Sequence, residues 1–122
     1  MAKLILIIDD SLTMLMSIQQ TLEMAGFDVK TAQDGDEALD KLTEGLKPDL
    51  VITDINMPRM NGLEFIKKAR EIIRFTPILA LTTESKTSKK EEAKSYGATG
   101  WLLKPVDSES LIKVVKQVVP GA

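Results

Sequence analysis

The chain has 122 residues, 43% of them hydrophobic and 28% charged, which is ordinary for one globular domain and foreign to disordered or collagenous chains. Its 16 basic and 18 acidic residues give a net charge of -2, so no overall positive field exists to attract nucleic acid or anionic lipid. The lack of cysteine and histidine excludes disulfides, thiolate zinc sites and Ser-His catalysis. The chemistry must therefore use carboxylates, hydroxyls, lysines and the backbone.

Five short apolar segments alternate with longer amphipathic ones. Their length and aliphatic, mostly β-branched content are typical of buried strands. The predicted strands are residues 4–8, 27–32, 50–53, 78–81 and 101–103. The longest wholly apolar run, residues 4–8, is far too short for a membrane span or the core of a signal peptide. We therefore expect a cytoplasmic protein.

The segments between the strands carry helix start and stop signals. Three residue pairs have capping-box spacing and predict helix starts: Asp34 with Glu37, Asn61 with Glu64, and Ser88 with Glu91. Three glycines follow predicted helices where a left-handed C-cap would lie: Gly26, Gly45 and Gly97. The segment from Lys86 to Tyr96 contains few apolar residues, so we expect this helix to pack shallowly and to be mobile.

This regular alternation predicts an α/β fold of (βα)5 type, in which a five-stranded parallel sheet is doubly wound by helices on both faces. Residues 1–122 are expected to form one domain. In such a sheet, ligands bind beyond the carboxyl ends of the strands. Asp9 and Asp10 follow the first predicted strand, Asp54 the third, Thr82 the fourth and Lys104 the fifth. We expect these five side chains to meet at one edge of the sheet.

Each of these residues taken alone has a simpler interpretation. An acid or serine after the first strand can cap the next helix, and Asp54 can belong to an ordinary turn. Thr82 can be a strand residue with high β propensity, and Lys104 a solvated surface lysine. Their joint placement favours a functional cluster, because independent accidents would not all fall at the same end of the strands.

Three neighbouring carboxylates repel one another, which raises at least one pKa unless a cation compensates. Oxygen ligands favour a hard cation, and Mg²⁺ commonly takes one or two carboxylates and keeps several waters. A carboxylate can also act as the nucleophile toward phosphorus. A metal ion and a lysine can neutralise the charge of a transferring phosphoryl group without any general base. The cluster therefore predicts phosphoryl transfer with Mg²⁺.

Four features, in order, resemble the response-regulator receiver domain of two-component systems: the pair Asp9 and Asp10, the stretch from Asp54 to Gly62, Thr82, and Lys104 followed by Pro105. The resemblance spans essentially the whole chain. It implies a flavodoxin-like fold with strand order 2-1-3-4-5. Residues 81–85 and 97–101 are also similar to stretches common in the single-domain chemotaxis members of that family.

The resemblance implies that Asp54 accepts a phosphoryl group from a phosphohistidine of a separate sensor histidine kinase, of the CheA type in chemotaxis. It also implies the Mg²⁺ ligands: Asp9, Asp10, Asp54 and the main-chain carbonyl of Asn56. Lys104 would pair with phosphoryl oxygens, and a cis peptide to Pro105 would aim its side chain inward. Thr82 would hydrogen-bond the phosphoryl group after transfer. Such a protein is a signalling phosphoacceptor that catalyses only its own phosphorylation and dephosphorylation.

In the family, the Thr82 hydrogen bond draws the following loop inward and lets an aromatic residue on the fifth strand turn from exposed to buried. The implied switch residues are Thr83, Glu84 and Trp101, where Tyr or Phe is usual at the last position. Because only residues 119–122 follow the last predicted helix, we expect no output domain. The signal would leave through binding to a flagellar motor switch protein or a phosphorelay partner, and a phosphatase would be a further partner. We expect a monomer that neither binds nucleic acid nor inserts into a membrane.

Three alternatives use related chemistry or topology. A haloacid-dehalogenase-like phosphatase needs a second aspartate where Asn56 stands, and it needs a cap domain. A flavodoxin-like electron carrier needs a Ser/Thr/Gly-rich phosphate loop where Asp9 and Asp10 stand. The third alternative, a single-domain phosphorelay intermediate of the receiver family, has the same site residues, and the sequence does not choose between it and a flagellar motor regulator.

Overall fold

The computed structural model describes residues 2–57, 59–83, 87–119 and 121. The five strands are β1 Leu4–Ile8, β2 Asp28–Ala32, β3 Leu50–Asp54, β4 Ile78–Thr82 and β5 Gly100–Leu103. They form one parallel sheet in the order β2-β1-β3-β4-β5. The predicted fold class and strand order are confirmed, and every predicted strand boundary lies within one residue of the observed one.

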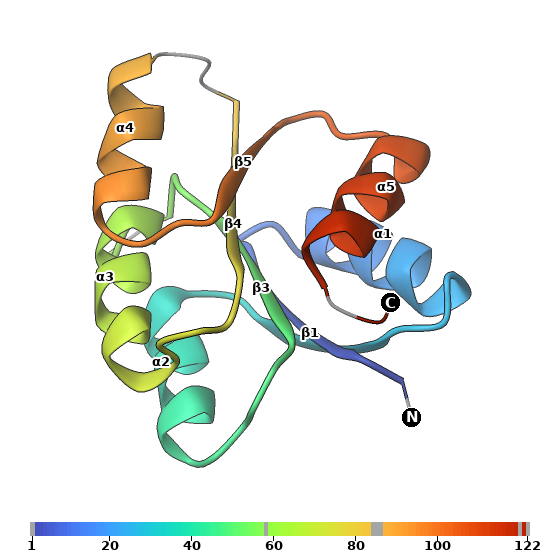
Figure 1. Cartoon of the computed structure of the whole chain (residues 1–122), viewed down its shortest axis with the longest axis horizontal. Coiled ribbons are helices and arrows are strands. Elements are labelled where there is room, and N and C mark those ends of the chain that lie inside the picture. Colours follow the sequence, from blue (N-terminus) through green and yellow to red (C-terminus); the bar gives the residue numbers. More distant parts are fainter. Residues whose placement is uncertain (1, 58, 84–86, 120, 122) are drawn as a thin grey trace.

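Helices cover both faces of this sheet. They are α1 Leu12–Met24, α2 Gly35–Thr43, α3 Gly62–Ile72, α4 Thr87–Ser95 and α5 Ser108–Val118. Figure 1 shows α1 and α5 on one face and α2, α3 and α4 on the other. Every residue of β3 and β4 is buried, as expected for central parallel strands covered on both sides.

The core consists of two apolar clusters, one on each side of the sheet. Because successive strand side chains point to opposite faces, Leu6 and Ile8 of β1 belong to the cluster beneath α2 and α3. Ile5 and Ile7 of the same strand belong to the cluster beneath α1 and α5. The near-continuous apolar strands therefore supply both cores, and the polar groups that end them lie at the edge between the two.

Local side-chain hydrogen bonds define most of the helix starts. Asp34 accepts from the backbone N–H of Glu37 at 2.8 Å, and Asn61 accepts from that of Glu64 at 2.9 Å, so these two predicted caps are confirmed. Of the residues that could cap the first helix, Ser11 is the one that does so, accepting from the Met14 N–H. Asp9 accepts from the backbone N–H of Ser11 at 2.9 Å through Oδ1, which leaves its Oδ2 available for other contacts.

The predicted start of the fourth helix at Ser88 is wrong. Helix α4 begins at Thr87, so Ser88 lies inside its first turn. The sequence from Ser85 to Ser88 offers several hydroxyl side chains in succession, and capping-box spacing alone does not choose among them. The helix ends were better predicted, because all three glycines expected to end helices have positive φ.

Helix α4 makes few apolar contacts. Among its described side chains, from Lys90 to Ser95, only Ala93 is buried. Tyr96, just beyond its end, is half-buried and lies 5.7 Å from the Lys67 ammonium of α3, measured to the ring centre. The shallow packing predicted for this segment is present, while its mobility stays a prediction. None of the helices within the described residues is long and apolar enough to cross a bilayer.

Candidate functional site

Three carboxylates gather at the carboxyl edge of the sheet. Asp54 is the last residue of β3, and Asp9 and Asp10 directly follow the neighbouring strand β1. One carboxylate oxygen from each lies within 4.8 Å of the others. Asp9 is 1% and Asp54 4% exposed, whereas Asp10 is exposed. The parallel register of β1 and β3 therefore brings together acids that are 45 residues apart in the chain.

Lys104 reaches this cluster from the end of β5. Its ammonium lies 3.0 Å from Asp9 Oδ2 and 3.3 Å from Asp54 Oδ1, and its side chain is 16% exposed. Its backbone N–H donates to the carbonyl of Thr82 at 2.7 Å, which fixes where the chain leaves the sheet. The Lys104–Pro105 peptide is cis, which confirms the geometry that the resemblance implies.

The acids are not fully compensated by this lysine. Burial raises the pKa of Asp54, the charge of Asp9 raises it further, and the opposing effects of Lys104 and the Asn56 N–H do not restore it. Burial works against the charge of Lys104, but the hydrogen bond to Asp9 and the charges of Asp54 and Asp9 outweigh it and raise the pKa of the lysine. The lysine stays protonated, and the site retains an excess of negative charge.

This donor set fits a hard divalent cation. Three carboxylates and one ammonium leave two negative charges uncompensated, which is the charge that Mg²⁺ would neutralise. All the available groups are oxygens, and Mg²⁺ needs oxygen ligands at about 2.0–2.1 Å. The backbone N–H of Asn56 donates to Asp54 Oδ1 at 3.4 Å, so the main chain of Asn56 also lies at the site. Receiver domains bind Mg²⁺ at such an acidic pocket.

The other predicted residues divide into those at the site and those beyond it. Thr82 ends β4 and is 1% exposed. It lies one residue beyond Leu81, the partner of Asp54 in the sheet register. Thr83 is exposed and follows the end of the strand. Glu84 lies outside the described residues. The structure thus places Thr82 at the same edge as the acids and Lys104.

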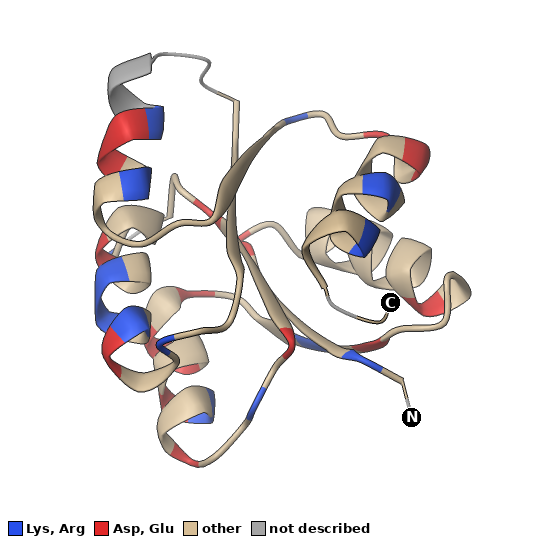
Figure 2. Ribbon diagram, in the orientation of Figure 1, with Lys and Arg blue, Asp and Glu red and all other residues tan. Residues whose placement is uncertain are grey.

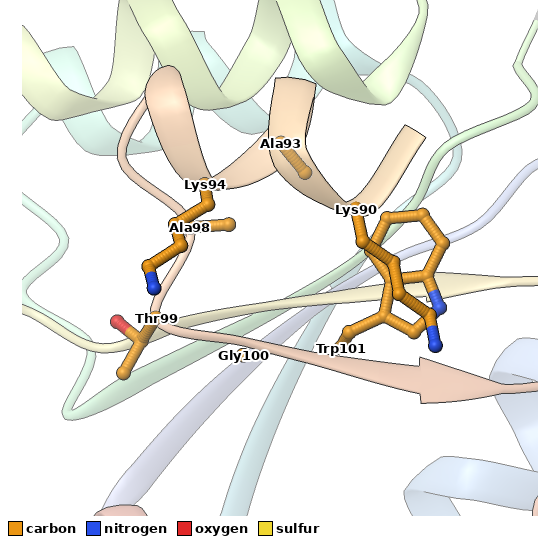
Figure 3. Close-up of a pocket in the computed structure, with 7 residues that line it drawn as sticks. All are labelled: Lys90, Ala93, Lys94, Ala98, Thr99, Gly100 and Trp101. Carbon is orange, nitrogen blue, oxygen red and sulfur yellow. The ribbon is translucent and has the colours of Figure 1, made fainter. Parts of the chain in front are cut away.

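Trp101 lies on β5, away from the carboxylates. It lines a groove of about 180 Å³ between β5 and α4, together with Lys90, Ala93, Lys94 and the chain at 98–100. Figure 3 shows Lys90 and Ala93 extending from α4 toward the strand that carries Trp101. The indole is half-buried, and its Nε1–H is buried without a hydrogen-bond partner among the described residues. A buried donor of this kind costs free energy until a partner supplies an acceptor.

Two features of the site were not foreseen from the sequence. Gly62 begins α3, and a Cβ at this position would collide with the carbonyl oxygen of Asp54, so the glycine lets the helix start against the strand end. Arg59 forms an ion pair with Asp34 at 2.9 Å, whereas the capping-box pattern predicts only a helix cap for Asp34. The Asn61-Gly62 dipeptide was an available signal for the first feature, whereas no local pattern indicates the second.

Charge elsewhere on the described surface is mixed. Acidic and basic residues are interspersed along α2, α3 and α4 (Figure 2), so none of these helices presents a single sign of charge. The buried acids at the ends of β1 and β3 therefore stand out as a concentrated negative site rather than as part of a generally acidic surface.

The response regulator receiver domain model matches residues 5–116, and the chain belongs to this family. Among solved structures, the chemotaxis response regulator CheY4 of Vibrio cholerae superimposes with a TM-score of 0.92 and 45% sequence identity, covering 97% of this chain and 99% of that one. The similarity supports a CheY-like receiver domain.

Curated relatives fall into two groups by length. The chemotaxis protein CheY1 of Helicobacter pylori is 38% identical over 120 residues, which are 96% of this chain and 96% of that protein. The alkaline phosphatase synthesis transcriptional regulatory protein PhoP of Bacillus subtilis is 36% identical over 119 residues, 98% of this chain but 49% of that protein. The chain thus spans about half the length of the transcriptional regulators it matches.

Proposed function

We propose that Asp54 is the phosphoacceptor of this receiver domain and that a phosphohistidine of a sensor histidine kinase is its donor. The single observation that best supports this role is that Asp54 ends a central strand in contact with Lys104 and next to two further carboxylates. Asp54 also has the raised pKa of a carboxylate that lacks full compensation. Such a group gains most from the arrival of a cation, so activation of the nucleophile depends on metal binding.

The transfer is a direct displacement at phosphorus. A carboxylate oxygen of Asp54 forms a bond to phosphorus while the phosphorus–nitrogen bond of the donor breaks. The donor imidazole leaves with the electron pair and takes up a proton, and Asp54 carries an acyl phosphate. Mg²⁺ held by Asp9, Asp10, Asp54 and the Asn56 carbonyl would neutralise charge on the phosphoryl oxygens.

Lys104 and Thr82 act on the phosphoryl group from the side of β4 and β5. The Lys104 ammonium is within 3.3 Å of the accepting carboxylate, so it can pair with a phosphoryl oxygen with little movement. The hydroxyl of Thr82, at the end of the next strand, can donate to another. These contacts form only when the phosphoryl group is present. They therefore supply the free energy difference between the phosphorylated and unphosphorylated states of the domain.

We infer that the output surface is the groove between α4 and β5, with Trp101, Thr83 and Glu84 as switch residues. This assignment is supported by the shallow packing of α4 and by the unpartnered indole N–H. A small movement of Thr82 toward the phosphoryl group would change the space available to Trp101 on the neighbouring strand. Partners that favour one position of the indole would then bind one phosphorylation state.

Within the family, we propose that residues 1–122 act as a single cytoplasmic, monomeric receiver domain in chemotaxis, phosphorylated by a CheA-like kinase and read by a flagellar motor switch protein. A dedicated phosphatase is a further expected partner. The chemotaxis protein CheY1 is among the relatives of this chain, and the chemotaxis response regulator CheY4 is 45% identical to it, which supports this role. The alternative is a single-domain phosphorelay intermediate, which would use the same site.

The phosphoacceptor is tested with radiolabelled acetyl phosphate, a small phosphoryl donor, in the presence of Mg²⁺. We expect protein labelling that alkali removes, as for an acyl phosphate, in the wild type, none in Asp54→Asn, and none in the wild type with EDTA. Asp40→Asn is the matched control, because Asp40 is exposed on α2 and the same change there should leave labelling intact. Undiminished labelling of Asp54→Asn contradicts the acceptor, and labelling that survives EDTA contradicts the metal.

The output surface is tested by Trp101 fluorescence with beryllofluoride and Mg²⁺, which stand in for the phosphoryl group. We expect a change in emission wavelength or acrylamide quenching that Thr82→Ala weakens and Thr82→Ser, which keeps the hydroxyl, preserves. Identical emission in both states would exclude a swing of the indole. Capture of partners from the native cell with and without beryllofluoride then separates a motor switch protein from a histidine-containing relay protein.

A further inference from the structure

The loop between β3 and α3 is attached to the start of α2. Its described residues are 55–57 and 59–61. Arg59 Nη2 lies 2.9 Å from Asp34 Oδ2. Met60 is buried, and its sulfur would be only 2.8 Å from a Cβ placed on Gly35, so the loop lies close against the first turn of the helix. The side chains of two consecutive loop residues therefore fix its position relative to α2.

Arg59 adopts a backbone conformation that arginine disfavours. Its φ is 65°, the only positive value among the described non-glycine residues. The left-handed region costs most L-residues about 1–2 kcal/mol, and glycine or asparagine would adopt it more easily. Such strain persists where surrounding contacts determine the conformation. The ion pair to Asp34 is a contact that neither glycine nor asparagine could supply.

Asp34 uses its two carboxylate oxygens for two different elements. Oδ1 accepts from the backbone N–H of Glu37 at 2.8 Å and caps α2, while Oδ2 accepts from Arg59. The Asp34 side chain is 22% exposed and that of Arg59 is 71% exposed. The helix cap thus serves as a fixed anchor to which an exposed, charged side chain from the loop binds.

The same loop carries the main chain of Asn56, three residues before Arg59. Its backbone N–H donates to Asp54 Oδ1, and its carbonyl is the proposed fourth protein ligand of Mg²⁺. The two ends of the loop are drawn together by the Gly62 N–H, which donates to the Ile55 carbonyl at 2.8 Å. Between these points the ion pair with Asp34 is the outer attachment of the loop.

We propose that Asp34 and Arg59 are positioning residues for the phosphotransfer site. Their ion pair holds the β3–α3 loop so that the Asn56 carbonyl is ready for Mg²⁺, although neither side chain touches the metal. The inference rests on the proposed function of Asp54 and its neighbours. Both residues act through the loop. The direction in which Mg²⁺ affinity changes when Arg59 is replaced separates positioning of the loop from a purely electrostatic effect.

The sign follows from the charge of Arg59. If the guanidinium acted only through its positive charge, removing it would strengthen binding of a cation to the nearby acids. If it acts by holding the loop, removing it would weaken cation binding, because Asn56 must then be ordered at the moment of binding. A weaker site after loss of a positive charge therefore indicates positioning.

The experiment is calorimetric titration of the whole metal-free protein with Mg²⁺, paired with urea unfolding in EDTA. For Arg59→Asn we expect Mg²⁺ affinity about two- to five-fold weaker than in the wild type, the size typical of an exposed ion pair. Stability should be unchanged or higher, because asparagine tolerates the left-handed conformation. A positioning role predicts that Mg²⁺ affinity falls while the free energy of unfolding does not. A merely structural role would lower both.

Asp34→Ser tests the other half of the pair. Serine retains an N-cap acceptor for α2 but removes the partner of Arg59. We expect a similar loss of Mg²⁺ affinity, and the double variant should bind no more weakly than either single one, because both changes remove one interaction. Arg59→Lys keeps the charge and should recover part of the affinity.

Arg74→Asn is the matched control, since Arg74 is exposed beyond the far end of α3. It makes the same substitution and charge change away from the loop, so it should bind Mg²⁺ like the wild type. Equal or tighter binding by Arg59→Asn would overturn the positioning role while leaving the metal site intact. A wild-type protein that takes up no Mg²⁺ would instead overturn the proposed site, and with it the inference.

Discussion

The two ends of the parallel strands differ in how their charged groups are compensated. We call the end where the strands begin the amino edge and the end where they finish the carboxyl edge. At the amino edge, Arg70 of α3 donates to the carbonyls of Gly97, Ile73 and Thr76 at 2.6–3.0 Å and to the Thr99 hydroxyl at 3.4 Å. These neutral acceptors join α3, the loop after it and the chain that follows α4. Burial lowers the pKa of this arginine, yet its polar groups are satisfied by the protein itself.

At the carboxyl edge, the protein leaves its charges incompletely compensated. Asp54 and Asp9 share the single ammonium of Lys104, and the pKa of Asp54 is raised. The amino edge therefore stabilises the fold without needing a ligand, whereas the carboxyl edge would gain stability from a bound cation. Charged and polar groups that lack full compensation are expected at functional sites and not at structural ones. Substitutions at the two edges should have opposite effects on stability.

The largest expected effect is at the amino edge. Arg70→Met keeps much of the side-chain volume and removes four hydrogen bonds, so we expect the free energy of unfolding to fall by about 2–3 kcal/mol. Urea unfolding in EDTA measures this change. Mg²⁺ affinity should stay near the wild-type value, because Arg70 lies at the opposite end of the strands.

Arg74→Met is the control for Arg70→Met, since Arg74 is exposed on the chain just beyond α3 and should tolerate the change. If both variants lose the same stability, the hydrogen bonds of Arg70 do not tie the amino edge together. If Arg70→Met loses Mg²⁺ binding and Arg74→Met does not, the two edges are coupled, and the amino edge does not act independently of the metal site.

Asp54→Asn should have the next largest effect, with the opposite sign. It removes a buried charge whose protonated form the fold favours, so the metal-free protein should become more stable by about 0.5–2 kcal/mol, the range of common stabilising changes. Unfolding in EDTA measures it against Asp40→Asn. Added Mg²⁺ should stabilise the wild type and leave Asp54→Asn unaffected. A less stable metal-free variant would mean that the ion pair of Asp54 with Lys104 stabilises the fold by more than burial of the Asp54 charge destabilises it.

The pH dependence provides a graded version of the same test. The pKa of Asp54 in the folded protein is raised above the ordinary value of 3.8, which the unfolded chain has. At pH values between the unfolded-state pKa and the folded-state pKa, the folded protein therefore binds more protons than the unfolded one. Stability in EDTA should therefore fall as pH rises through this window and level off above it. Unfolding curves measured between about pH 4 and pH 8 should show a smaller fall in Asp54→Asn than in the wild type. Parallel curves would remove Asp54 as the cause.

The smallest stability effect is expected for Asp10→Ala. Asp10 is exposed, so its repulsion from the other acids is screened and the metal-free protein should gain only a few tenths of a kcal/mol. Its loss of Mg²⁺ binding should nevertheless be large, because a proposed ligand is removed. Retained Mg²⁺ binding in calorimetry, combined with lower stability, would assign Asp10 a structural role instead.

Much of the architecture follows from the sequence by itself because its signals are local. The apolar run at residues 4–8 and the caps at Asp34 and Asn61 depend on neighbours a few positions away, so the periodic pattern sets them. Parallel strands also bring their carboxyl ends to one edge, which is why Asp9, Asp54 and Lys104 could be expected to meet. The order of the strands came from family resemblance, since periodicity carries no information about which strands pair.

Tertiary structure alone decided how charge and burial are distributed among these residues. Asp9 and Asp10 are adjacent in sequence, yet Asp9 is buried against Lys104 and Asp10 is exposed. The charged partner of Asp9, Lys104, lies 95 residues away, and no local pattern selects it. The ion pair of Arg59 with Asp34 likewise joins separate elements. Local preferences act over a few residues, whereas a pKa, an ion pair or an unpartnered donor depends on every group that packing brings near it.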